Sequence, residues 1–310
     1  IAVTKGRNIS VLLDDINASL PEDAKLKRLP RANWISVREF QFISNNKGYA
    51  YNIEEKTSRG LPFVNTVGVN RPQYFADGSG MYGETVEGFA YCRNNNEVHM
   101  YSDTDGIVIG KTVHRSEFGI TNGLFPSPSN MLMAYYDMDE RMVTQYPLYQ
   151  LADTPATAKM LRYPTAGAKS HHVVVKVKNM ETDAAPVVIK TEGDSEQYLT
   201  NVSWSPDNKY ILIAVINREQ NHMWLNMYAA ETGVFIKTLF EEKNDRYVEP
   251  EHPEVFLKND PTKFIWWSER DGYNHLYLYD LEGNLIKQLT KGNWVVTAYH
   301  GMSTDESRLF

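Results

Sequence analysis

Residues Phe264–Thr290 hold three short strand-like runs separated by two turn signals, and this pattern constrains the fold more than any other feature of the sequence. The runs are Phe264–Trp267, His275–Tyr279 and Leu285–Leu289. Leucine and tyrosine alternate in the second run, which is the period of two that a β-strand imposes on its faces. Glycine in both intervening segments tolerates the positive φ of tight hairpins. The stretch therefore predicts three consecutive antiparallel strands.

The same order of runs recurs along the chain, in copies of different length at Tyr198–Phe240, Phe89–Thr112, Leu124–Lys178 and Trp34–Ile53. Self-similarity at a spacing of roughly 40–55 residues is typical of β-propeller blades, which have about four strands each. No segment shows a sustained helical period. We therefore predict an all-β fold, a β-propeller of four-stranded antiparallel blades that is incomplete in this chain. The Gly- and Pro-rich segment Gly60–Glu87 reads as a long loop or a degenerate blade.

The ends of the chain suggest its domain organisation. Residues 1–33 read as an N-terminal lead-in and residues 34–310 as the partial propeller. Ile1 is not preceded by a methionine, a basic segment or an apolar leader, so we expect that a signal peptide was removed or that the start was omitted. The last residues, Glu306–Phe310, resemble the first half of another strand. They predict that further sequence follows.

Composition excludes several classes of partner. The net charge of −7 and the isoelectric point near 5.7 argue against nucleic acid or an anionic membrane as a partner. No apolar run approaches the roughly 20 residues that a membrane-spanning helix needs. Cys92 is the only cysteine, so no intramolecular disulfide can form, and its strand-like surroundings predict a buried small hydrophobic residue.

Seven motifs occur in a fixed order: VHRSEFGI (113–120), LFPSPSN (124–130), MDERMVTQYPL (138–148), RYPTAGA (162–168), VSWSPDNKYI (202–211), RYVEPEHP (246–253) and the long run 266–297. Together they resemble the N-terminal β-propeller of bacterial dipeptidyl peptidase IV enzymes, which belong to the prolyl oligopeptidase class of serine peptidases. The resemblance extends from about Phe89 onward. The last two motifs are the most specific to that family.

The resemblance implies an eight-bladed propeller stacked on a C-terminal α/β-hydrolase domain that carries a Ser-Asp-His triad. It implies release of dipeptides from peptide N-termini that have proline or alanine in second place, in a periplasmic or otherwise exported bacterial protein. The chain has no G-x-S-x-G nucleophile motif. We therefore expect the hydrolase domain to be absent from this chain, assign no catalytic residue in it, and expect the chain alone to be inactive. No cofactor or metal is implied.

The resemblance also implies one binding site on the propeller. In the family, an acidic pair on an insert between strands holds the free α-ammonium of the substrate. The matching insert here is Arg115-Ser116-Glu117, in which Glu117 matches the second acid and Ser116 replaces the first. A carboxylate can satisfy the charge and donors of an ammonium. Glu117 is thus the candidate for binding a peptide N-terminus, with Ser116 and Arg115 as weaker candidates; the alternative is a surface glutamate on a charged loop.

A second acidic segment lies in the connector that contains Glu249, Glu251 and His252. These side chains could bind a cation. A calcium site, however, has an Asp- or Asn-rich loop around its ligands, and no such loop surrounds these residues. A structural connector is the favoured interpretation.

Two functional hypotheses follow. The first is the substrate-gating propeller of a serine exopeptidase. Its expected partners are a peptide substrate with a free N-terminus and the missing hydrolase domain, and a homodimer is possible. The second is a non-catalytic propeller that acts as a binding or scaffold protein without an active hydrolase domain, which the serine at position 116 favours. In either case, open sheet edges predict self-association of the isolated fragment.

Overall fold

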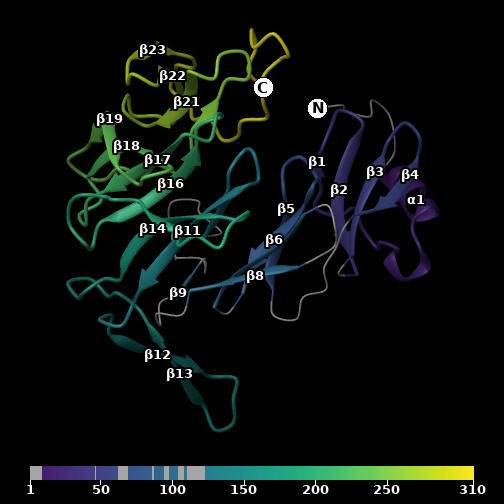
Figure 1. The fold of residues 1–310 in the computed structure, drawn as a ribbon, viewed down its shortest axis with the longest axis horizontal. Helices are drawn as coiled ribbons and strands as arrows, with labels where there is room; N and C mark the ends of the chain where they lie inside the picture. The colour runs from purple at the N-terminus through teal and green to yellow at the C-terminus, as the bar shows by residue number, and fades with distance from the viewer. Residues whose placement is uncertain are drawn as a thin grey trace. The chain divides into compact units, whose positions relative to one another are not determined.

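The computed structural model describes residues 9–45, 47–61, 69–85, 87–93, 98–103, 108–109 and 123–310. The chain forms two compact units, residues 1–103 and residues 104–310, and each is described by itself. Figure 1 shows that both are built almost entirely from strands.

The described part of the first unit contains a helix followed by two four-stranded antiparallel sheets. Helix α1 (Ile9–Ser19) ends shortly before Pro21, and a 3₁₀ turn follows at Glu22–Ala24. The strands of the first sheet are β1 (Asn33–Trp34), β2 (Glu39–Ser44), β3 (Lys47–Asn52) and β4 (Thr57–Gly60). Those of the second sheet are β5 (Asn70–Tyr74), β6 (Gly80–Glu84), β7 (Gly88–Arg93) and β8 (His99–Ser102).

Both faces of the first sheet are buried. Ile16 of the helix and Leu20, the residue after it, pack with Phe42 of β2 and Tyr51 of β3. The other face forms a core with the second sheet, and Cys92 lies in that core with an exposed fraction of 1%. The prediction of a buried Cys92 is confirmed.

Of the two interpretations of Gly60–Glu87, the long loop was wrong, and the blade is a regular four-stranded one rather than a degenerate one. This segment holds β5 and β6, and Phe89 lies in the third strand of that sheet rather than at the start of a repeat. A Cβ on Gly80 would lie 1.9 Å from the carbonyl oxygen of Cys92. The glycine therefore permits close approach of two strands, although in the sequence it resembled a loop signal.

The second unit contains three further sheets of the same kind. The third sheet contains β10 (Leu124–Pro126), β11 (Leu132–Asp139), β14 (His172–Asn179) and β15 (Val187–Val188), with β9 (Val108–Ile109) as an additional strand. The fourth contains β16 (Tyr198–Trp204), β17 (Tyr210–Ile216), β18 (His222–Ala229) and β19 (Phe235–Lys243). The fifth contains β20 (Val255–Phe256), β21 (Lys263–Ser268), β22 (His275–Asp280) and β23 (Leu285–Gln288).

The fourth sheet packs face to face against the third and the fifth. Ile211, Ile213 and Val215 of β17 share a core with the third sheet, whereas the alternate residues Leu212 and Ala214 share a core with the fifth. A strand that is buried on both faces reads as a continuous apolar run, which β17 does. The predicted meander at Phe264–Thr290 is confirmed as β21–β23, with positive φ at the glycines of both turns.

Among the described residues, five of the six sheets contain four antiparallel strands paired in chain order, with β9 as a fifth strand in the third sheet, and these five are the blades of an incomplete β-propeller. The predicted fold class is confirmed. One hairpin, β12 (Gln145–Gln150) and β13 (Thr157–Arg162), lies outside the blades and pairs only with itself among the described strands.

Candidate functional site

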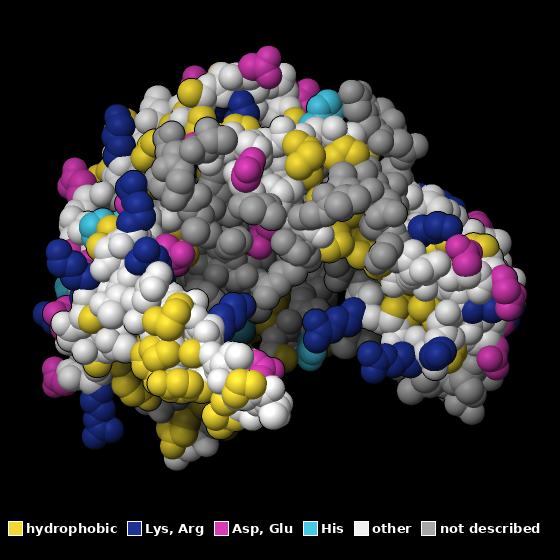
Figure 2. All heavy atoms as spheres, turned by 90° about the horizontal axis from the view of Figure 1, so that it is seen from below, with side chains coloured by type: hydrophobic (Ala, Val, Ile, Leu, Met, Phe, Trp, Pro, Cys, Tyr) yellow, Lys and Arg dark blue, Asp and Glu magenta, His cyan; other side chains and the backbone are white. Residues whose placement is uncertain are grey.

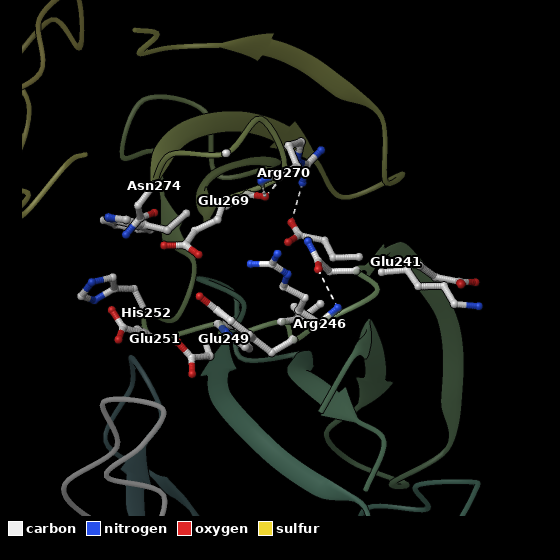
Figure 3. A pocket seen from close by; sticks show the side chains of 17 residues that line it. Glu241, Arg246, Glu249, Glu251, His252, Glu269, Arg270 and Asn274 are labelled. Carbon is white, nitrogen blue, oxygen red and sulfur yellow. Dashed lines mark hydrogen bonds and ion pairs between the residues drawn. The ribbon is translucent and has the colours of Figure 1, made fainter. Parts of the chain in front are cut away.

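A cavity of about 440 Å³ lies in the second unit, where the end of β19, the connector 244–252 and the turn between β21 and β22 meet (Figure 3). Its size is within the range of sites that bind small molecules or peptide termini. Its charged and aromatic lining side chains are Glu241, Glu242, Lys243, Arg246, Tyr247, Glu249, Glu251, His252, Trp267, Glu269 and Arg270.

Three of the lining carboxylates have no cation to neutralise them. No side-chain hydrogen bond or ion pair joins the carboxylates of Glu249, Glu251 or Glu269 to another described residue. Burial raises the pKa of Glu249, and the nearby carboxylates of Glu251 and Glu269 raise it further. The side chains come from two different segments, since Glu269 follows β21 (Figure 3). Their mutual repulsion would be relieved by a bound cation.

Arg270, in the turn between β21 and β22, already has a carboxylate partner. Arg270 Nη2 lies 2.5 Å from Glu242 Oε1, and Arg270 Nε donates to Ser268 Oγ at 2.9 Å. Its guanidinium also lies 4.5 Å from the centre of the Tyr277 ring, a cation–π geometry. Arg270 therefore stabilises the wall and does not neutralise the three carboxylates.

Two lining cations, Lys243 and Arg246, form no ion pair among the described residues, and Arg246 offers the planar guanidinium with five donors. Its guanidinium has no carboxylate partner among the described residues and extends into the cavity (Figure 3). Carboxylates on one side and a guanidinium on the other can bind a molecule that carries both an ammonium group and hydrogen-bond acceptors, because each pole has a matching partner.

A buried polar layer holds the connector against the fourth sheet. Asn201 Nδ2 donates to the carbonyl oxygen of His252 at 2.9 Å, and Ser203 Oγ donates to Glu254 Oε2 at 2.5 Å. Asn201 has a φ of 51° and lies at a bulge in β16, which aims its amide at the connector. Glu254 has an exposed fraction of 6%, and burial raises its pKa to about 7. These contacts fix the backbone that presents Glu249 and Glu251.

The residues that the sequence nominated first, Arg115, Ser116 and Glu117, lie outside the described residues, so their role stays a prediction. Sequence reasoning favoured a structural connector for the segment of Glu249 and Glu251, whereas the structure places both at a cavity. The signal that could have revealed the cavity was the alternation of carboxylates around Pro250. Its third acid, Glu269, lies on a separate segment.

The described ranges contain no group of three or more His, Cys, Asp or Glu side chains that is arranged to hold a metal ion. They also contain no helix that is long and apolar enough to cross a membrane.

Comparison with known proteins gives concordant matches. A family profile described as the dipeptidyl peptidase IV N-terminal region matches residues 90–310. A crystal structure of a putative dipeptidyl aminopeptidase IV from Bacteroides ovatus superposes with a TM-score of 0.78 and 36% identity, covering 96% of this chain and 44% of that chain. The dipeptidyl peptidase 4 structure of Porphyromonas gingivalis, with a TM-score of 0.69 and 24% identity over 89% of this chain, shares the fold.

Among curated proteins, dipeptidyl peptidase 4 of Felis catus is 25% identical over 209 residues, which is 61% of this chain and 27% of the cat protein. The chain therefore spans about a quarter of the length of that relative. The profile match covers most of this chain and includes the cavity described above. The chain belongs to the dipeptidyl peptidase IV N-terminal region family.

Proposed function

We propose that this chain is the substrate-gating and N-terminus-anchoring propeller of a serine exopeptidase that releases dipeptides whose second residue is proline or alanine. In this proposal a longer, exported protein supplies an α/β-hydrolase domain with the catalytic triad. The observation that supports the proposal is the cavity in which three carboxylates without cationic partners lie close to the free guanidinium of Arg246. Membership of the family supplies the class of reaction.

The anchoring step follows from the chemistry of a peptide N-terminus. An α-ammonium has three donors and a compact positive charge, which Glu249, Glu251 and Glu269 can accept. Arg246 can donate to the first peptide carbonyl of the same substrate. Holding the N-terminus at a fixed distance from a nucleophile selects the peptide bond that is cleaved. Glu117 is proposed as a further carboxylate for the ammonium, with Ser116 and Arg115 beside it on the same insert.

Neutralising the anchor is expected to weaken substrate binding. In the full-length protein, the double variant Glu249→Gln/Glu251→Gln should raise KM for a Gly-Pro-linked chromogenic substrate about tenfold with a smaller change in kcat, because a charge-assisted contact of the bound substrate is lost. Glu117→Gln should act in the same direction. Steady-state kinetics measure both parameters.

The matched control is Glu231→Gln, which neutralises an exposed glutamate that does not line the cavity. An N-acetylated Gly-Pro substrate, which lacks the ammonium, should be a poor substrate of the unmodified protein. Unchanged KM and kcat in the double variant would remove Glu249 and Glu251 from the anchor, and unchanged kinetics in Glu117→Gln would remove that residue.

The second candidate function is a non-catalytic propeller that binds peptides as a scaffold. The serine at position 116, where family members commonly have an acid, favours it. Under this alternative the folded full-length protein would not cleave Gly-Pro substrates, yet the double variant would still lower its affinity for a peptide with a free N-terminus. Cleavage of the substrate would exclude the alternative.

We also propose that the β12–β13 hairpin contributes to a homodimer. A two-stranded hairpin is marginally stable by itself, and this one exposes a large apolar surface. Figure 2, viewed from the side of the hairpin, shows a group of hydrophobic side chains there. The exposed hydrophobic residues on and around the hairpin are Tyr146, Leu148, Tyr149, Leu151, Met160 and Tyr163.

Placing charge on the hairpin is expected to dissociate this dimer. Tyr149 and Leu151 have exposed fractions of 66% and 82%, so Tyr149→Glu/Leu151→Glu should leave each subunit folded while making association unfavourable. Sedimentation velocity should then show a dimer for the unmodified protein and a monomer for the variant. Val234→Glu, at an exposed site away from the hairpin, is the control. A monomeric unmodified protein, or a variant that remains dimeric, contradicts the proposal.

A further inference from the structure

A second cavity, of about 430 Å³, lies on the face of the fourth sheet that packs toward the third. The third sheet is short beside this cavity, since β15 pairs with Lys176 and Val177 of the eight-residue strand β14. After β15 the chain crosses to the fourth sheet, where Lys190 N donates to the carbonyl oxygen of Gly233, and residues 192–194 then line the cavity. The cavity shares no lining residue with the one described above.

One wall of this cavity is aromatic. Trp224, Asn226 and Tyr228 alternate along β18 and so share one face of the strand, while the residues between them pack against the fifth sheet. Phe235 of β19 completes the wall. Aromatic rings that line a concave site provide a surface on which a cation or a flat group can stack.

Two hydrogen-bond donors on this wall have no acceptor. Among the described residues, the indole N–H of Trp224 donates to none. The side chain of Tyr228 is fully buried; its hydroxyl oxygen accepts from Asn226 Nδ2 at 3.2 Å, but its own proton has no acceptor within the described ranges. Thr238 Oγ1 donates to Asn226 Oδ1 at 2.7 Å, which fixes the orientation of the amide. Trp224 is only partly buried, so a ligand that carries an acceptor can reach its indole N–H, whereas Tyr228 has no exposed surface and contributes through the shape of the wall.

The rim of the cavity is acidic. Glu192, Asp194 and Glu219 line it, and burial raises the pKa of Tyr228 to about 12, with a smaller contribution from the charge of nearby Glu192. The one cation among the described lining residues is Arg218. Its guanidinium donates to the Tyr198 hydroxyl and lies 3.6 Å from Glu196 Oε2, so it is neutralised from outside the cavity. The cavity therefore has a net negative charge.

We propose that this cavity is a second binding site, for an arginine side chain of a peptide together with the adjacent peptide carbonyl. A guanidinium is planar, stacks on aromatic rings and donates to carboxylates, which matches the aromatic wall and the acidic rim. The carbonyl accepts from the indole N–H of Trp224. This inference requires no peptidase activity and does not depend on the anchoring site.

The test uses a probe pair of the same shape, in which a charged guanidinium is replaced by a neutral urea group. The full chain is titrated with Nα-acetyl-arginine methylamide and with its neutral isostere, Nα-acetyl-citrulline methylamide, by calorimetry and by tryptophan fluorescence. The arginine probe is expected to bind at least about tenfold more tightly than the citrulline probe, because the charge-assisted and cation–π contacts are lost in the second. Equal affinity for the two probes, or no binding of the arginine probe, overturns the proposal.

Variants locate the site. Trp224→Leu and the pair Glu192→Gln/Asp194→Asn should each weaken binding of the arginine probe about tenfold, while Trp224→Phe, which keeps an aromatic ring, should retain most of the affinity. Glu231→Gln, an exposed glutamate that does not line the cavity, is the control. Circular dichroism verifies that each variant is folded. If Trp224→Leu, Trp224→Phe and the unmodified chain bind the arginine probe with the same affinity, the probe binds elsewhere and the assignment is overturned.

Discussion

Replacing Glu254 by glutamine is expected to raise the free energy of unfolding at pH 8 by roughly 3 kcal/mol and to leave it nearly unchanged at pH 4. The Glu254 carboxyl is buried, and burial raises its pKa from the ordinary 4.5 to about 7. Above pH 7 the folded protein must bury a charged carboxylate whose Oε1 has no hydrogen-bond partner among the described residues. Glutamine keeps an acceptor for Ser203 and has no charge to bury.

The direction of the pH dependence follows from proton linkage. Between pH 4.5 and 7 the folded state binds more protons at Glu254 than the unfolded state does, so stability falls as the pH rises. The contribution of the protonated carboxyl is fully present below about pH 4.5 and is lost as the pH rises through about 7. In the glutamine variant this component disappears.

Urea unfolding of both proteins from pH 4 to pH 8 measures the difference in their free energies of unfolding. The contributions of all other titrating groups cancel in this difference. Glu231→Gln controls for loss of one surface charge. If the unmodified protein and Glu254→Gln show parallel pH profiles, Glu254 titrates normally and its carboxylate is better solvated than the structure indicates.

Replacing Arg270 by methionine is expected to lower the free energy of unfolding by about 3 kcal/mol. Methionine keeps much of the apolar contact with Tyr277, but the carboxylate of Glu242 loses its cation. The Glu242 side chain has an exposed fraction of only 13%, and the indole N–H of Trp266, at 2.9 Å, would be its remaining partner. Leaving a charge buried and unpaired costs more than the pair itself contributes.

A double-mutant cycle separates the pair from the packing. Glu242→Gln alone should destabilise the protein, and adding it to Arg270→Met should recover part of the loss, because no charge is then left buried. Glu282→Ala removes a pair with Lys237 in which the glutamate is 78% exposed, and should cost less than about 1 kcal/mol. Purely additive effects of the two variants would contradict a coupled pair.

The strand pattern was accessible to sequence reasoning because it is local. Alternation along His275–Tyr279 and the continuous apolar run Tyr210–Ile216 each report how many faces of a strand are buried. The glycines of Gly60–Glu87 misled that reasoning, since a glycine needed for a positive φ and one needed for close strand approach look identical in sequence.

The sequence predicted only part of the two candidate sites. Glu249 and Glu251 were visible as an acidic connector, but their proximity to Glu269 and to the free guanidinium of Arg246 depends on how a connector between two sheets meets a turn in the second of them. The cavity beside Trp224 depends on a strand that ends after two residues, in a different sheet.

The amino-acid sequence by itself thus determined the all-β meander blades and the family motifs, because both depend on residue periodicity and turn residues within short stretches of the chain. Only the tertiary structure decided which carboxylates lack a partner, which cations are already engaged and where a face is uncovered. Those properties are set by contacts between segments far apart in sequence, and hydrophobic burial, which joins the sheets, is non-directional and leaves no local pattern that specifies them.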